Sequence, residues 1–104
     1  MSILEGVLKE ELERIKKNIN SYELVLEDLP KGYIFNQKVN GRLYCYRKRR
    51  EGDKIVSIYI GPAESDEAKK ALIDYLERKR IESNLRSLRI EKDRLLKALR
   101  HYGG

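Results

Sequence analysis

The chain contains one cysteine, Cys45, and one histidine, His101, among its 104 residues. A single cysteine excludes an internal disulfide framework and a cysteine-bound structural zinc, and it favours a reducing compartment. His101 lies near the C-terminal end, where we expect it to be a helix C-terminal cation. The sequence also lacks a glycine-rich phosphate loop and the His/Cys/Asp spacing of a metal site. We therefore predict no catalytic residue, no metal ligand and no cofactor, and expect that the protein is not an enzyme.

Long hydrophobic runs are missing as well. No window of the sequence approaches the ~18 apolar residues that a membrane-spanning helix needs. The first 17 residues lack the uninterrupted apolar core of a signal peptide. The sequence therefore predicts a soluble, cytoplasmic protein with no membrane partner.

Charged residues are abundant instead, at 38% of the sequence beside 40% hydrophobic residues. This balance is typical of long helices, and the length leaves room for one domain, residues 1–104. Lysine and arginine number 23 against 17 acidic residues, so the net charge is +6. This excess favours a polyanion as partner, although a moderately basic protein can also simply be soluble.

Two amphipathic segments flank the middle of the chain. In residues 3–28 the apolar side chains recur at alternating spacings of four and three, which predicts a helix with one apolar face. Pro30 and Gly32 end this helix. Residues 66–102 contain neither glycine nor proline and are predicted to form one long helix or two abutting helices, with Ser65 as the N-cap.

The two apolar stripes, residues 4–26 and 81–102, have nearly equal lengths. Equal stripes suit an antiparallel pair of helices within one chain. A monomer is therefore favoured, and a homodimer through the helices is the alternative.

Between the helices, residues rich in tyrosine, isoleucine and valine alternate with turn signals. Asn40-Gly41 is favoured in two-residue hairpin turns, and Gly52-Asp53 is a second candidate turn. The predicted strands are 33–39, 42–50 and 54–60. The predicted fold is α+β, with an N-terminal helix, a three-stranded antiparallel β-meander over residues 33–60, and a long C-terminal helix that pairs antiparallel with the first.

The hairpin register sorts the strand side chains onto two faces. One face is aromatic and basic, and its members are Tyr33, Phe35, Tyr44, Tyr46, Tyr59, Arg42, Lys48 and Arg50. The other face is aliphatic, and its members are Ile34, Leu43, Cys45, Val56, Ile58 and Ile60. The aliphatic face is the better core, and we expect it to pack on Ala68, Leu72 and Leu76. Cys45 would then be a buried small hydrophobe.

An aromatic and basic sheet face left toward solvent is a candidate binding surface. Bases stack on exposed tyrosines, and flanking lysines and arginines contact phosphates. A β-ribbon can also enter a DNA major groove. The predicted nucleic-acid or partner-binding residues are Arg42, Tyr44, Tyr46, Arg47, Lys48, Arg49, Arg50, Lys54 and Tyr59. Three alternatives stay open. The tyrosines can simply be good cross-strand pairs, the aromatic face can instead be the core with its hydroxyls at the rim, and the run at 47–50 can simply discourage edge-to-edge aggregation.

The same hairpin carries a resemblance. The segments G-R-L-Y-C-Y at 41–46, R-E-G-D-K-I-V-S at 50–57 and Y-I-G at 59–61 resemble a hairpin found in small uncharacterised proteins of Gram-positive bacteria and their phages. A looser likeness extends to the N-terminal hairpins of some transposases and integrases, which bind DNA. This chain departs from the pattern at Arg47-Lys48-Arg49, where neutral or aliphatic residues are common. The closer family implies no activity.

Two functions follow as expectations. The first is a small basic module that binds nucleic acid, DNA or RNA, through the aromatic and basic sheet face. The alternative is a protein-binding inhibitor or adaptor encoded by a phage or mobile element, such as an anti-CRISPR protein, which would act in the bacterial host cytosol. Tyrosine and arginine suit both kinds of partner.

Overall fold

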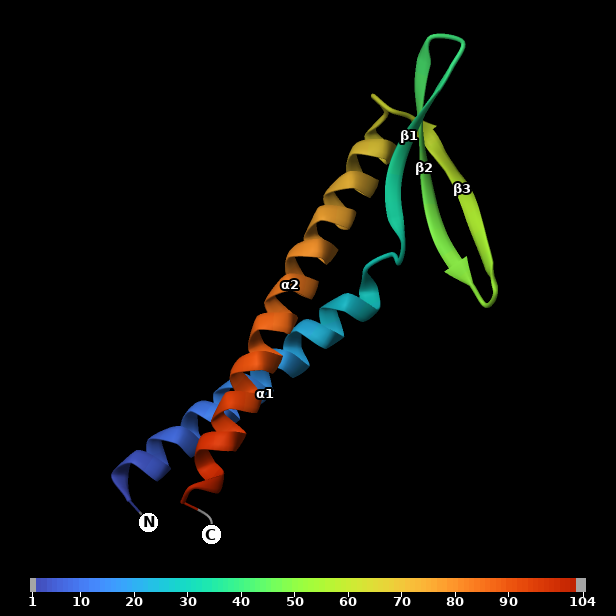
Figure 1. Ribbon diagram of the computed structural model, residues 1–104. Coiled ribbons are helices and arrows are strands. Elements are labelled where there is room, and N and C mark those ends of the chain that lie inside the picture. Colours follow the sequence, from blue (N-terminus) through green and yellow to red (C-terminus); the bar gives the residue numbers. More distant parts are fainter. Residues whose placement is uncertain (1, 103–104) are drawn as a thin grey trace. The chain divides into compact units, whose positions relative to one another are not determined.

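A computed structural model describes residues 2–102 and shows an α+β fold (Figure 1). Its elements in chain order are α1 (Ile3–Asp28), β1 (Tyr33–Val39), β2 (Arg42–Glu51), β3 (Lys54–Pro62) and α2 (Asp66–Arg100). The predicted order of elements is confirmed. Residues 66–100 form one unbroken helix, and His101 and Tyr102 lie in a turn beyond it. No helix within residues 2–102 is long and apolar enough to cross a membrane.

The chain forms two compact units. Among the described residues, the helical unit comprises residues 2–28 and 80–102, and the sheet unit comprises residues 29–79. Because α2 runs through the boundary at residue 80, its first part belongs to the sheet unit and its last part to the helical unit.

Serine side chains cap both helices. The Ser2 Oγ accepts a hydrogen bond from the Glu5 amide at 3.0 Å, and the pair forms the S-x-x-E spacing of a capping box. The Ser65 Oγ accepts from the Ala68 amide at 3.2 Å and donates to the Pro62 carbonyl at 2.7 Å. The predicted N-cap at Ser65 is therefore confirmed, and it fixes where α2 begins after β3.

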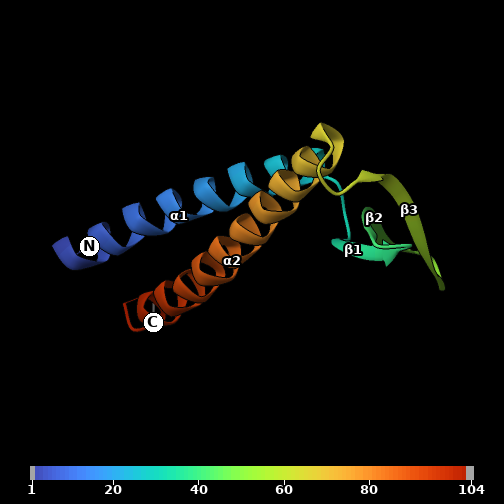
Figure 2. The same ribbon diagram turned by 90° about the horizontal axis from the view of Figure 1, so that it is seen from above.

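The core of the helical unit lies where the middle of α1 meets α2. The buried side chains among its described residues are Leu12, Ile15, Ile19, Ile81 and Leu85. The two helices run antiparallel, and an ion pair of 3.1 Å joins Glu23 to Arg89. The predicted stripe begins at Leu4, yet Leu4 is exposed. Figure 2 shows the reason, because the helices diverge toward their terminal ends.

The sheet has the order β1-β2-β3, and its register is the predicted one. Val39 faces Arg42, Phe35 faces Tyr46, and Tyr46 faces Tyr59. At the first turn Asn40 and Gly41 have φ of 50° and 81°, the two positive angles that a two-residue turn of this kind requires.

β3 contains a β-bulge that the sequence pattern does not predict. Tyr46 pairs with Tyr59 but Cys45 pairs with Gly61, so Ile60 is an extra residue in β3. β3 then continues to Pro62, which pairs with Tyr44. A bulge bends and twists the strand that carries it, here at the tyrosine pair in the middle of the sheet.

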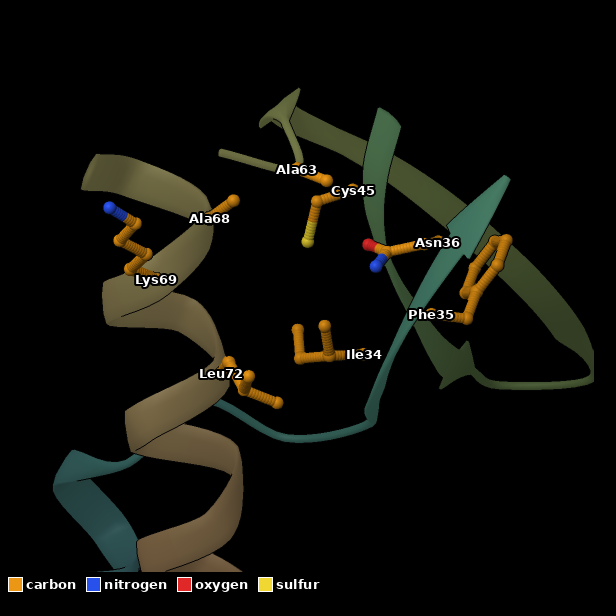
Figure 3. Close-up of a pocket in the computed structure, with 8 residues that line it drawn as sticks. All are labelled: Ile34, Phe35, Asn36, Cys45, Ala63, Ala68, Lys69 and Leu72. Carbon is orange, nitrogen blue, oxygen red and sulfur yellow. The ribbon is translucent and has the colours of Figure 1, made fainter. Parts of the chain in front are cut away.

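One face of the sheet packs against the first turns of α2. Figure 3 shows Ile34 and Cys45 pointing toward Ala68 and Leu72, while Phe35 points away. Cys45 and Ala68 are buried, as is Ala71 on the same helix. The prediction that the aliphatic face forms the core is thus confirmed at its centre. At its margins Leu43 and Ile58 stay exposed. The expected packing on α2 is confirmed at Ala68 but not at Leu72 and Leu76, which are both exposed.

Two contacts hold the start of the sheet unit in place. Arg78 Nη1 donates a hydrogen bond to the Leu29 carbonyl at 3.0 Å. Gly32 has a φ of 99°, and a Cβ at this position would lie 2.1 Å from the Lys48 carbonyl oxygen. Only glycine therefore allows the chain to pass this close to β2.

Candidate functional site

Five aromatic rings form one continuous row across the three strands, on the face opposite to α2. We call Tyr33, Phe35, Tyr46, Tyr59 and Tyr44 the aromatic row. Successive ring centroids lie 6.1 Å apart for Tyr33–Phe35, 5.5 Å for Phe35–Tyr46, 5.5 Å for Tyr46–Tyr59 and 6.2 Å for Tyr59–Tyr44. These separations are typical of favourable aromatic pairs, so each ring helps to orient its neighbour.

The rings of the row differ in how much of their surface is free. Phe35 stacks on Tyr46 at an interplanar angle of 19°, and the Lys48 ammonium lies 5.0 Å from the Phe35 ring centroid. Tyr33 and Tyr59, in the two outer strands, are 47% and 54% exposed. Phe35 and Tyr46 therefore support the row, and the rings of Tyr33 and Tyr59 offer free surface to a ligand.

Tyr33 was absent from the predicted site although the alternation had placed it on this face. The signal that could have found it is its position at an outer strand, opposite Lys48. A residue there has a sheet neighbour on one side only, which leaves its ring accessible.

The hydroxyl of Tyr59 has a raised pKa. Desolvation raises the pKa of Tyr59 above its ordinary value of 10.0, and Tyr44, Tyr46 and Glu64 raise it further. The neutral phenol is therefore the relevant form near neutral pH, and it can donate a hydrogen bond to an acceptor on a ligand.

Strand alternation divides the six predicted cations between the two sheet faces. Arg42, Lys48 and Arg50 share the face of the aromatic row, because each stands an even number of residues from Tyr46 in β2. Arg47 and Arg49 point to the opposite face, together with Lys54, which pairs with Glu51. The aromatic row thus has three cations on its own face.

Those three cations do not lie at one hairpin tip. Arg42 is next to the Asn40-Gly41 turn, and Arg50 is next to the turn at Gly52. Lys48 lies between them, above Phe35. The positive charge is therefore spread along β2 beside the row, a distribution that can follow an extended polyanion.

The cations of the opposite face have other contacts. Arg49 donates to the Glu51 carboxylate from Nε at 3.1 Å and from Nη2 at 2.6 Å. Arg47 lies near Cys45, whose thiol has a pKa raised by burial and lowered to a lesser degree by the Arg47 charge. The structure thus separates Arg47, Arg49 and Lys54 from the tyrosines with which the sequence had grouped them.

A small hollow of about 160 Å³ lies between α2 and the sheet face opposite the aromatic row (Figure 3). Ile34, Cys45, Ala68 and Leu72 give it an apolar lining, beside Asn36 and Lys69. Within residues 2–102 no three His, Cys, Asp or Glu side chains are grouped so that they could hold a metal ion.

Fold and site together define a small α+β protein with an open aromatic sheet face. The chain belongs to the family described as Domain of unknown function (DUF6788), which matches residues 5–70. The matched region includes nearly all of α1, the whole sheet and the first turn of α2. No curated protein and no solved structure matches the chain.

Proposed function

We propose that the protein binds single-stranded nucleic acid through the face of the sheet that carries the aromatic row. The observation that carries the proposal is the combination on one face of two half-exposed outer rings, Tyr33 and Tyr59, with Arg42, Lys48 and Arg50. Rings of this kind are stacking platforms, and the cations alongside them can contact phosphates.

The free ring surfaces favour unpaired bases over a duplex. In a double helix both faces of each base are already stacked, whereas an unpaired base can lie flat on a tyrosine. Stacking of one base on an aromatic side chain contributes ~1–3 kcal/mol in single-strand binders. Stacking is tolerant of base identity, so we expect weak sequence preference in DNA or RNA.

The charge of the protein supports the same assignment. The net charge of +6 attracts a polyanion over a distance, and the three cations of the aromatic face provide local phosphate contacts. For a single strand, log Kd changes by ~0.7 per phosphate contact for each tenfold change in salt. Three contacts therefore predict a slope of about 2.

The experiment is a fluorescence anisotropy titration of labelled single-stranded DNA, single-stranded RNA and duplex DNA of equal length. We expect one of the single strands to bind more tightly than the duplex, with affinity that falls as salt rises. Replacement of Tyr59 by Ala should weaken binding by ~1–3 kcal/mol, and Tyr59→Phe should retain most of it because the ring remains. An absence of binding to any strand at low salt would overturn the proposal.

A protein partner is the second candidate, and one observation favours it. Ile55 lies on the aromatic face opposite Arg50 and is 63% exposed. An exposed isoleucine opposite an arginine, on the sheet face that also carries the tyrosines, suits a protein interface of the kind that an inhibitor or adaptor needs. Replacement of Ile55 by Ser should abolish capture of such a partner and leave nucleic-acid binding nearly unchanged.

A further inference from the structure

The helical unit has an open groove between its two helices. The groove has a volume of about 200 Å³ and is lined by Glu11 and Ile15 of α1 and by Glu91, Arg94 and Leu95 of α2. Its α2 residues, 91–95, follow the buried Ile81 and Leu85 toward the C-terminal end of the helix. Figure 2 shows that α1 and α2 diverge in this direction.

Helical spacing extends the face that carries this groove. Val7 and Leu4 precede Glu11 by four and seven residues, so they share its side of α1. Ala98 follows Leu95 by three residues and shares its side of α2. Leu4 and Val7 are each 54% exposed. We call these residues, with those lining the groove, the groove face.

The helical unit has a small core beside the groove face. The buried side chains among its described residues number five, and none of them lies in residues 2–11 or 86–102. Antiparallel helix pairs reach a full core when a second pair covers them, as in a four-helix bundle. A second pair of helices over the groove face would complete the core of the helical unit in the same way.

The charges of the two helices indicate which partner covers the groove face. Residues 3–14 of α1 carry four carboxylates and two cations, a net charge of −2. Residues 86–100 of α2 carry six cations and two carboxylates, a net charge of +4. A second copy that places its α2 over α1 brings opposite charges together, whereas α1 over α1 would bring like charges together.

The rim of the groove is self-complementary as well. Glu11 and Arg14 form an ion pair on α1, with Arg14 Nε 3.0 Å from Glu11 Oε2. Glu91 and Arg94 have the same spacing of three residues on α2. Because each helix has one acid and one arginine at its rim, two identical faces can exchange partners across a two-fold axis.

We propose that the groove face binds a second copy of this chain, with α1 of each copy lying over α2 of the other around a two-fold axis parallel to the helices. Leu4, Val7 and Ala98 are the apolar contacts, and the groove closes into the centre of a four-helix bundle. This inference is independent of the proposed nucleic-acid binding.

Sedimentation equilibrium over a concentration series into the hundreds of micromolar tests the proposal. For the wild-type protein we expect the mass of a dimer, which is twice the 12.3 kDa of one chain. The double variant Leu4→Gln/Val7→Gln should sediment as a monomer, since glutamine keeps the helix and removes the apolar contact. The matched control is Ile73→Gln/Leu76→Gln, which alters two exposed apolar residues of the sheet unit and should leave the dimer intact.

The orientation of the two copies is tested by disulfide formation between introduced cysteines. The chains used carry Cys45→Ser, which removes the native thiol. A chain with Val7→Cys is mixed with a chain with Ala98→Cys and oxidised. A disulfide between the two different chains is expected. A wild-type chain that stays monomeric throughout, a Leu4→Gln/Val7→Gln variant that still dimerises, or a disulfide formed mainly between two Val7→Cys chains would each overturn the proposal.

Discussion

Tyr46 and Tyr59 face each other across β2 and β3 with their ring centroids 5.5 Å apart and their planes at 60°. This edge-on contact joins the supported rings of β1 and β2 to the exposed ring of β3. The β-bulge at Ile60 begins immediately after Tyr59, where the extra residue changes the direction of the strand. The pair therefore sets the position of the most exposed ring of the aromatic row.

Gly32 should be the least replaceable glycine of the sheet unit. Gly32→Ala combines a positive φ with a Cβ placed 2.1 Å from the Lys48 carbonyl oxygen. Gly41→Ala is the matched control, because Gly41 also has a positive φ but its Cβ would meet open space. In urea unfolding we expect a loss of about 1–2 kcal/mol for Gly41→Ala and of at least about 3 kcal/mol for Gly32→Ala. Equal losses would contradict the close approach.

Ser65 should stabilise the start of α2. Ser65→Ala removes the hydroxyl that accepts from the Ala68 amide and should lower the free energy of unfolding by ~1 kcal/mol. Ser87→Ala, at an exposed position inside the same helix, is the control and should be neutral or slightly stabilising, since alanine has the higher helix propensity. Thermal denaturation followed by circular dichroism compares the two, and similar midpoints would argue against the cap.

Tyr59 should make the stability depend on alkaline pH. Because its pKa is raised in the folded state, the folded chain holds this proton more tightly than the unfolded chain does. The contribution is complete below pH 10 and is lost as the pH rises through the folded pKa. Unfolding free energies measured across this range should fall more for the wild type than for Tyr59→Phe. A parallel decline in both would show that Tyr59 is not the group responsible.

Cys45 should react slowly with thiol reagents. It is 2% exposed, and burial raises the pKa of its thiol, so both access and the thiolate form are disfavoured near neutral pH. Labelling by a disulfide reagent should proceed through opening of the sheet unit and accelerate in subdenaturing urea. Labelling as fast as that of an unfolded control peptide would contradict the packing of Cys45 against α2.

The sequence was informative about the strands because the turns determine their register. Asn40-Gly41 and Gly52 each fix a two-residue loop, and every pairing expected from them occurs, from Val39 with Arg42 to Tyr46 with Tyr59. The bulge at Ile60 carries no turn residue that would mark it. Only the pairing of Cys45 with Gly61 in the structure shows this bulge.

The candidate site could be predicted only in part. Alternation placed the tyrosines on one face, but the basic run at 47–50 was grouped by closeness in sequence, and neighbouring strand residues point to opposite faces. The ion pair of Arg49 with Glu51 also depends on side-chain geometry that a pattern does not contain. Likewise, equal apolar stripes indicated the helix pair but not the angle that leaves Leu4 exposed.

The most direct test of the binding account compares two double variants that remove the same charge from opposite sheet faces. Lys48→Ala/Arg50→Ala acts on the face of the aromatic row, and Arg47→Ala/Arg49→Ala acts on the other face. Binding of single-stranded nucleic acid is measured by anisotropy over a range of salt, with circular dichroism to confirm that both variants fold. The first variant should bind more weakly and reduce the salt slope by about 1.4, while the second should keep a slope close to that of the wild type. Equal losses in the two variants would contradict the assignment of binding to the aromatic face.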